Sequence, residues 1–192
     1  MSNLIIYTAV YRENEDGKCL RAAASFRVLN GPDSIDKSFE STTATYGDLW
    51  LRKLAQMLSI AITNLAKHRT TVKLITGQDV TRKMADKLQR ALLDCVGRGE
   101  LPSRERAELA VLKQGRYTAR PNDSLYADVV MLLWEAYARD RIGFAHVYLD
   151  GSKDTYDLVK QLHSGSKLGR QLTTGANKRR RAQEAKQVNA PL

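Results

Sequence analysis

Cysteine and long hydrophobic runs are scarce in this sequence of 192 residues, and each scarcity excludes a class of protein. The two cysteines, Cys19 and Cys95, lie far apart in apolar contexts without metal-ligand spacing, which predicts buried thiols in a reduced compartment. No apolar run approaches the roughly 20 residues that a membrane-spanning helix requires. The N-terminal residues enter a strand directly, without a charged leader. These absences predict a soluble, cytoplasmic protein without a membrane partner.

Recognisable catalytic and cofactor motifs are also missing. The sequence has no glycine-rich phosphate loop and no dinucleotide fingerprint. Its three histidines, His68, His146 and His163, are scattered and form no Ser/His/Asp or Cys/His arrangement. We therefore expect no cofactor.

An uneven excess of positive charge is present instead. The formal net charge is +10, and 43% of the residues are hydrophobic, enough for one domain with a core. From Ser164 to Leu192 there are seven Lys or Arg against one acid, a net charge of +6 that leaves +4 for the rest. We expect a folded domain over 1–163 and a basic flexible tail over 164–192. Because solubility needs no such segregation of charge, the pattern favours a polyanionic partner.

Two halves of the domain differ in hydrophobic period. Residues 4–11, 19–29 and 35–42 alternate or are rich in β-branched side chains, which predicts three strands in an antiparallel meander, with Leu20 facing inward. Later segments predict helices over 48–66, 79–96, 103–112, 123–139 and 154–163, and strands over 72–76 and 144–149. Thr45 or Gly47, Ser103 and Asp123 are the expected helix caps, and Val80 is expected to face the core. This order predicts an α+β fold with a mixed sheet and a basic excursion over 97–121.

The order of elements and three local motifs resemble the ribonuclease H fold. Residues 6–8, Ile-Tyr-Thr, are similar to the start of the first strand in cellular ribonucleases H, which continue with a catalytic aspartate. Residues 42–49 resemble the stretch before the family's first helix, whose catalytic glutamate lies in the first turn, and residues 72–78 resemble its fourth strand. The resemblance covers roughly 4–162 and implies a ribonuclease H-like, five-stranded mixed sheet in which alternating helices and strands follow the meander. It also places the excursion where some members carry a basic, substrate-gripping protrusion.

The resemblance implies a degenerate active site. Hydrolysis in this family needs two Mg²⁺ ions about 4 Å apart, held by carboxylates from strand one, helix one, the end of strand four and the last helix. The corresponding residues here are Ala9, Asp48, Gly77 and either Asp154 or Asp157, and Asp79 lies two residues beyond Gly77. Ala9 and Gly77 offer no carboxylate, so we expect a non-catalytic protein without a metal. The alternative is a divergent metal-dependent nuclease that uses Asp48, Asp79 and Asp154 or Asp157, although aspartates near helix starts are commonly caps or dipole partners.

The leading functional hypothesis is a nucleic-acid-binding protein with little sequence specificity, most suited to RNA or single strands. Its predicted contacts are Arg82, Lys83, Lys87 and Arg90 on the outer side of one helix, then Arg116, Tyr117 and Arg120, and finally Lys178, Arg179, Arg180 and Arg181 in the tail. Tyr117 lies between two arginines and offers a surface on which an unpaired base can stack. Interleaved acids at Glu100, Glu105 and Glu108 predict that part of the excursion pairs with itself.

Two further alternatives stay open. The fold could serve as an adaptor for another protein, with Trp50, Trp134, Tyr137, Tyr148 and Tyr156 as anchors, although aromatic residues at helical spacing are more often core. A basic tail could also bridge several nucleic-acid molecules and so promote assembly. A compact basic binder of this kind would suit a bacterium or its virus.

Overall fold

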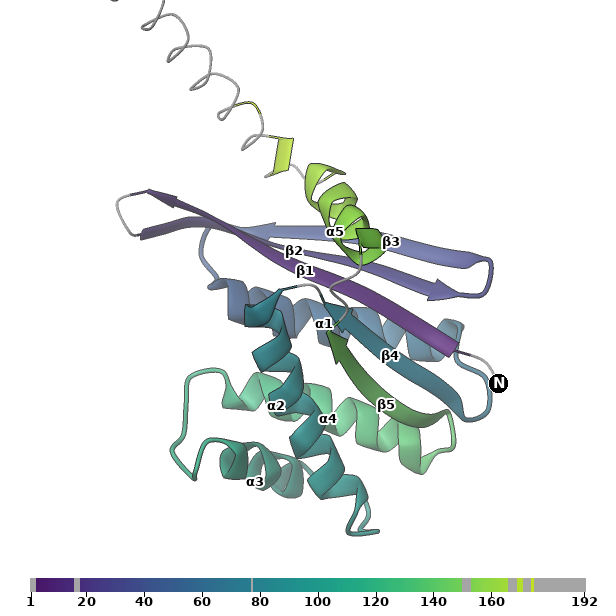
Figure 1. Ribbon diagram of the computed structural model, residues 1–192. Coiled ribbons are helices and arrows are strands. Elements are labelled where there is room, and N and C mark those ends of the chain that lie inside the picture. The colour runs from purple at the N-terminus through teal and green to yellow at the C-terminus, as the bar shows by residue number, and fades with distance from the viewer. Residues whose placement is uncertain are drawn as a thin grey trace, which may run out of the picture.

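A computed structural model describes residues 3–15, 18–76, 78–149, 153–165, 169–170 and 174 (Figure 1). Of residues 15, 18–19, 144–149, 153–156 and 159, it describes the backbone alone. The elements are β1 (Asn3–Glu15), β2 (Lys18–Asn30), β3 (Asp33–Ser41), α1 (Tyr46–Asn64), β4 (Thr70–Thr76), α2 (Asp79–Val96), α3 (Arg104–Gln114), α4 (Asp123–Ala138), β5 (Ile142–Leu149) and α5 (Lys153–Gly165). The predicted sequence of strands and helices is confirmed.

One mixed sheet, in the order β3-β2-β1-β4-β5, organises the fold. β1, β2 and β3 form the expected antiparallel meander, with Thr8 opposite Phe26 and Phe26 opposite Lys37. β4 and β5 add in parallel, since Leu4 pairs with Val72 and Val72 with Ala145. The α+β prediction with a mixed sheet is therefore confirmed.

Helices cover both faces of the sheet. α1 packs on β1 and β2, and α4 packs on β5 and against α1, so these two helices share one face (Figure 1). α5 lies over β1 and β2 on the opposite face. α2 and α3 pack against α4 and against each other, and α2 also contacts β5, β1 and β4. The core lies between the sheet and α1, where Phe26, Trp50 and Leu54 have no exposed surface.

Two of the three predicted helix N-caps are confirmed by the structure. Thr45 accepts a hydrogen bond from the backbone of Asp48, and Ser103 accepts one from the backbone of Arg106. Asp123 is not the cap of α4, because the N-cap position is Asn122. Asp123 instead lies in the first turn, where its carboxylate accepts from the backbone of Arg120.

Two side chains predicted to face the core do not. Leu20 is 42% exposed and Val80 is 37% exposed. Leu20 lies near the end of the β1–β2 hairpin, which runs beyond the neighbouring strands (Figure 1), and Val80 lies in the first turn of α2. At Leu20 the alternation was predicted correctly, but the hairpin extends past the core that would bury the side chain.

Arg141, just before β5, caps the C-terminal end of α1 although it is distant in sequence. Its guanidinium donates to the carbonyl oxygens of Ile62, at 2.9 Å, and Thr63, at 3.1 Å. α1 has no basic residue in its last turn, so this distant side chain satisfies carbonyl groups that the helix leaves unpaired. Among the described residues, the structure has no helix that is both long and apolar enough to span a membrane.

Candidate nucleic-acid interface

The parallel strands β1 and β4 part at the position where the resemblance places metal ligands. Their last paired residues are Thr8 and Thr76, while β1 continues toward the hairpin. Beyond this point the side chain of Gln78 makes the hydrogen bonds to β1 that a continuing β4 would make. Its Oε1 accepts from the backbone N–H of Val10 at 2.8 Å, and its Nε2 donates to the backbone carbonyl of Val10 at 2.9 Å. One carboxamide thus satisfies both backbone groups that β4 leaves unpaired.

Buried hydroxyl groups surround this closure and are bonded to one another or to Trp50. The indole N–H of Trp50 donates to the Thr8 hydroxyl at 2.7 Å. The Thr76 and Thr81 hydroxyls are hydrogen-bonded to each other, and Thr81 also donates to the Gln78 carbonyl at 3.0 Å. Thr8, Thr76 and Thr81 have no exposed surface. Ala9, in the middle of β1, is fully buried as well.

These residues do not fit the two-magnesium centre that the resemblance implies. The alanine on β1 offers no ligand, and both polar ends of Gln78 are occupied by the backbone of Val10. Gly77 and the side chain of Asp154 lie outside the described residues. Across the described ranges, no group of three or more His, Cys, Asp or Glu is placed to hold a metal ion.

The other candidate ligands are dispersed over helix starts. Asp48 is half-buried in the first turn of α1, where its own N–H is held by the Thr45 cap. The Asp79 side chain is 86% exposed and lies 4.0 Å from Arg82. Asp157 is exposed on α5. Each therefore occupies a position where an acid interacts favourably with a helix dipole or with solvent.

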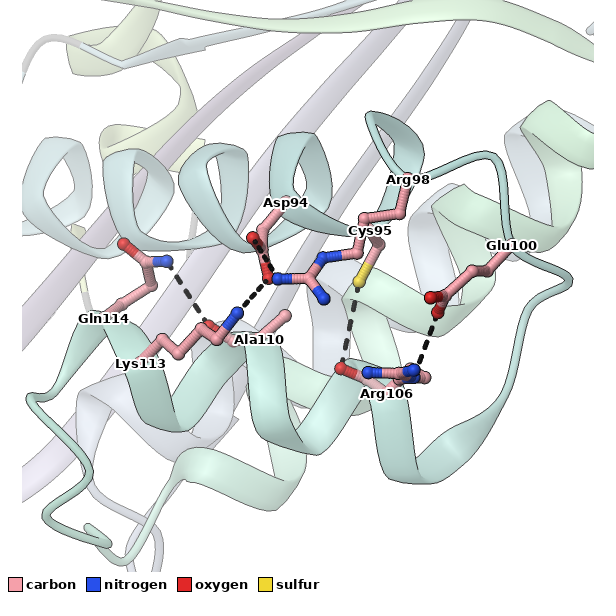
Figure 2. A network of polar contacts seen from close by, with 8 residues as sticks. All are labelled: Asp94, Cys95, Arg98, Glu100, Arg106, Ala110, Lys113 and Gln114. Atoms are coloured by element: carbon pink, nitrogen blue, oxygen red, sulfur yellow. Dashed lines mark hydrogen bonds and ion pairs between the residues drawn. The ribbon is translucent and has the colours of Figure 1, made fainter.

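Most charges of the excursion are paired, either with one another or with an acid of α2. Figure 2 shows the junction of α2 and α3, where the Asp94 carboxylate lies 3.2 Å from Arg98 and 3.3 Å from Lys113. Desolvation by burial acts to raise the pKa of Asp94, but the hydrogen bonds from Lys113 and Arg98 outweigh it and lower this pKa below its usual value. Arg106 lies 2.9 Å from Glu100. This part of the excursion is thus a self-neutralised network.

Arg104 is also committed to internal contacts. Its guanidinium pairs with Asp128 and lies 2.7 Å from Glu108, and hydrogen bonds to these two acids raise its pKa. The same side chain donates to the Ser124 carbonyl at 3.3 Å, which links α3 to α4. Arg104 therefore ties two helices together.

Four of the predicted contact residues are cations that stay exposed. Lys83 and Arg90 lie on α2, and Arg116 and Arg120 lie in the α3–α4 loop (residues 115–122). None of the four forms a salt bridge within the described part of the chain. Tyr117 is 67% exposed beside them. Arg82 is exposed too, but it lies 4.0 Å from Asp79 and 3.8 Å from Asp86.

Lys87 does not lie on the outer side of α2, as the helical period predicted. Its ammonium lies 2.5 Å from the Asp123 carboxylate, and both side chains are only 12% exposed. The ammonium also lies 4.5 Å from the centre of the Tyr126 ring. The prediction was wrong because α4 packs against the side of α2 that carries Lys87.

Two features of this region had no local signal in the sequence. Gln78 contacts a strand 68 residues away, so no motif could indicate its role. Arg12 lies over the ring of Tyr46, 5.6 Å from its centre, and adds an exposed cation beside the start of α1. The tail residues Lys178, Arg179, Arg180 and Arg181 lie outside the described residues.

Comparisons with known proteins bear on the fold. No protein-family model matches the chain, and no curated protein matches it. Among solved structures, it is similar to the prototype foamy virus protease-reverse transcriptase, a protein that contains a ribonuclease H domain, with a TM-score of 0.50 and 14% sequence identity. The match covers 86% of this chain and 21% of that one. The fold is ribonuclease H-like. At this identity the likeness concerns architecture, and this chain spans about a fifth of the matched one.

Proposed function

We propose that this protein binds nucleic acid without cutting it, with a preference for RNA or single strands. The observation that supports this most is the separation of its cations into two kinds. Lysines and arginines of the α2–α3 junction are held by acids, whereas Lys83, Arg90, Arg116 and Arg120 stay exposed without a salt bridge in the described part of the chain. Cations that are not already neutralised are available to displace counterions from phosphates.

These free cations belong to neighbouring elements. Lys83 and Arg90 lie four residues before and three residues after Lys87, so helical geometry places all three along one side of α2. Lys87 is bonded to Asp123, which directly follows the loop that carries Arg116 and Arg120. The exposed cations therefore flank, in sequence, the Lys87–Asp123 contact between α2 and the start of α4.

We propose that the protein does not cleave nucleic acid because the space where β1 and β4 part is filled by the Gln78 side chain and its hydrogen bonds. Gln78 uses both ends of its carboxamide on the backbone of Val10, and the residue on β1 at the expected aspartate position is Ala9. A protein with this packing can offer a surface for nucleic acid while the ends of β1 and β4 are joined by the hydrogen bonds of Gln78.

The proposal is tested by measuring the affinity for nucleic acid at several salt concentrations. Fluorescence anisotropy with labelled RNA, single-stranded DNA and RNA–DNA hybrid should give affinities that fall with salt, with a log–log slope of about −0.7 for each phosphate neutralised on a single strand. Replacing Arg116 and Arg120 together with alanine should weaken binding and reduce the slope by about 1.4. The matched variant, Arg104→Ala with Arg106→Ala, removes the same formal charge from paired residues and should change the slope less. Affinity that is indifferent to salt would sink the proposal.

The divergent nuclease remains the second candidate, because Asp48 and Asp79 lie at helix starts near the strand ends. Incubating the same three probes with Mg²⁺ or Mn²⁺ separates the two functions. We expect intact probes. Cleavage that Asp48→Asn abolishes would replace the binding proposal with the nuclease.

A further inference from the structure

The backbone of the α3–α4 loop starts with an unusual form of a common helix end. The Arg116 N–H donates to the Lys113 carbonyl at 3.1 Å, and the Tyr117 N–H donates to the Leu112 carbonyl at 2.9 Å. This pair of bonds is the Schellman arrangement, which normally has glycine in the left-handed position. Here that position is Arg116, with φ of 55°, and Tyr117 follows with φ of 62°. Two successive side chains are held in a conformation that disfavours them, and both project into solvent.

The other end of the loop is fixed by a partly buried ion pair. The Arg120 backbone N–H donates to Oδ2 of Asp123 at 3.0 Å. Oδ1 of the same carboxylate accepts from Lys87 Nζ at 2.5 Å. Each oxygen of Asp123 therefore has one partner, and the pair links the loop exit to α2. Because both side chains are 12% exposed, solvent competes little for these contacts.

We propose that the α3–α4 loop is a preformed element for single-stranded nucleic acid, in which an unpaired base stacks on Tyr117 and Lys87 acts as a positioning residue through Asp123. The inference rests on the proposed function. It goes further because it assigns the contact to one loop, names Tyr117 as the stacking surface and gives Lys87 an indirect role.

The exposed ring of Tyr117 favours single-stranded nucleic acid over a duplex as the ligand. A tyrosine that is 67% exposed offers its face to a base, but the faces of bases inside a duplex are covered by their neighbours. Arg116 and Arg120, on either side of the ring in sequence, supply cations for the adjoining phosphates. Because both ends of the loop are already fixed, little backbone ordering is needed when the ligand binds.

Asp123 gives the proposal a test in which the sign of the effect is decisive. Asp123→Asn removes a negative charge beside the loop, so a general electrostatic field would make the variant bind nucleic acid more tightly. If the ion pair positions the loop, the same variant binds more weakly, by roughly three- to tenfold. The replacing asparagine has one acceptor oxygen and cannot hold both the Lys87 ammonium and the Arg120 N–H, so the loop is less fixed and must be ordered on binding. Asp128→Asn is the matched control: it removes the same charge from the same helix, at a residue that pairs with Arg104.

Lys87 is tested by the slope of the salt dependence. Lys87→Met should weaken binding while leaving the log–log slope unchanged, whereas loss of a phosphate contact would reduce the slope by about 0.7. In the Asp123→Asn background, Lys87→Met should have little further effect, since both changes break one link. The double variant also leaves no unpaired buried charge, so it keeps the test valid if either single variant does not fold. Melting curves recorded first identify the folded variants.

Tyr117 separates stacking from charge. Anisotropy with labelled oligouridylate and oligothymidylate should show about a 5- to 150-fold loss for Tyr117→Ala, near-normal binding for Tyr117→Phe, and little change for either variant on duplex DNA. Equal losses on single strands and duplex would overturn the stacking role. Tighter binding by Asp123→Asn, equal to that of Asp128→Asn, would overturn the positioning role. If the unmodified protein binds none of the probes in a salt-dependent way, the proposed function itself fails.

Discussion

Replacing Gln78 should destabilise the protein far more than loss of an ordinary surface glutamine. Gln78→Ala removes two hydrogen bonds at 2.8 and 2.9 Å and leaves the backbone N–H and carbonyl of Val10 without partners. Val10 is 5% exposed, so water reaches these groups poorly. An unsatisfied buried polar group costs about 1–3 kcal/mol. Because the truncation opens some room for water, we expect a total loss of about 2–4 kcal/mol in the free energy of unfolding.

Thermal and urea denaturation would measure this loss. In a domain of this size, about 1 kcal/mol shifts the Tm by roughly 2–4 °C, so Gln78→Ala should melt roughly 5–15 °C below the unmodified protein. Gln56→Ala is the control, because Gln56 is an exposed residue of α1 whose side chain accepts only from Lys53 in the described contacts. A Tm for Gln78→Ala within about 2 °C of the control would refute the reasoning.

A charged variant adds a pH test of the same geometry. In Gln78→Glu one carboxylate oxygen can still accept from the Val10 N–H, but the other faces the Val10 carbonyl and repels it. Protonation restores a donor there, so the folded state should raise the pKa of this glutamate above its usual value of about 4.3. The deficit of Gln78→Glu relative to the unmodified protein should therefore shrink as the pH falls through the raised pKa, and it should be smallest below about 4.3. A deficit that does not change with pH would show that the second hydrogen bond is unimportant.

Three further predictions concern separate parts of the molecule. Trp50→Phe removes the buried indole hydrogen bond to β1 and should lower stability by about 1–2 kcal/mol in urea denaturation; an unchanged midpoint would contradict this. Burial raises the pKa of the Cys95 thiol to about 11, so in a Cys19→Ser background a thiol reagent at pH 8 should react slowly until the protein is unfolded. Arg116→Gly relieves the left-handed backbone at φ 55° and should raise the Tm by a few degrees while weakening single-strand binding; a lower Tm would show that no strain is stored there.

Local periodicity was sufficient to predict most elements. The expected helix over 79–96 matches α2, because its apolar stripe is bounded by a turn on one side and by glycine on the other. The β1 and β2 strands run farther than expected, to Glu15 and from Lys18, since their polar ends pair through the backbone and carry no hydrophobic signal. The acids that alternate with arginines in the excursion also predicted its ion pairs. Glu100 pairs with Arg106, and Glu108 pairs with Arg104.

The site was less predictable because its contacts join distant parts of the chain. The helical period assigned Lys87 to one side of α2, but it could not reveal that Asp123 would pack there from another helix. Gln78 was not singled out, since its partner is on a strand 68 residues earlier. The missing carboxylate at Ala9 was readable from the sequence; the group that closes the resulting gap was not.

The long-range cap on α1 has a consequence for the order in which the chain can fold. Arg141 binds the carbonyl oxygen of Ile62 across 79 residues of sequence, and it directly precedes β5, the last strand of the sheet. A nascent chain that ends before this residue has α1 uncapped and β4 without its outer neighbour. Such a chain exposes a strand edge, which makes it prone to pair with other chains. Completion of the sheet during synthesis must therefore wait until Leu149, the last residue of β5, has been made, which is more than three quarters of the way along the 192 residues.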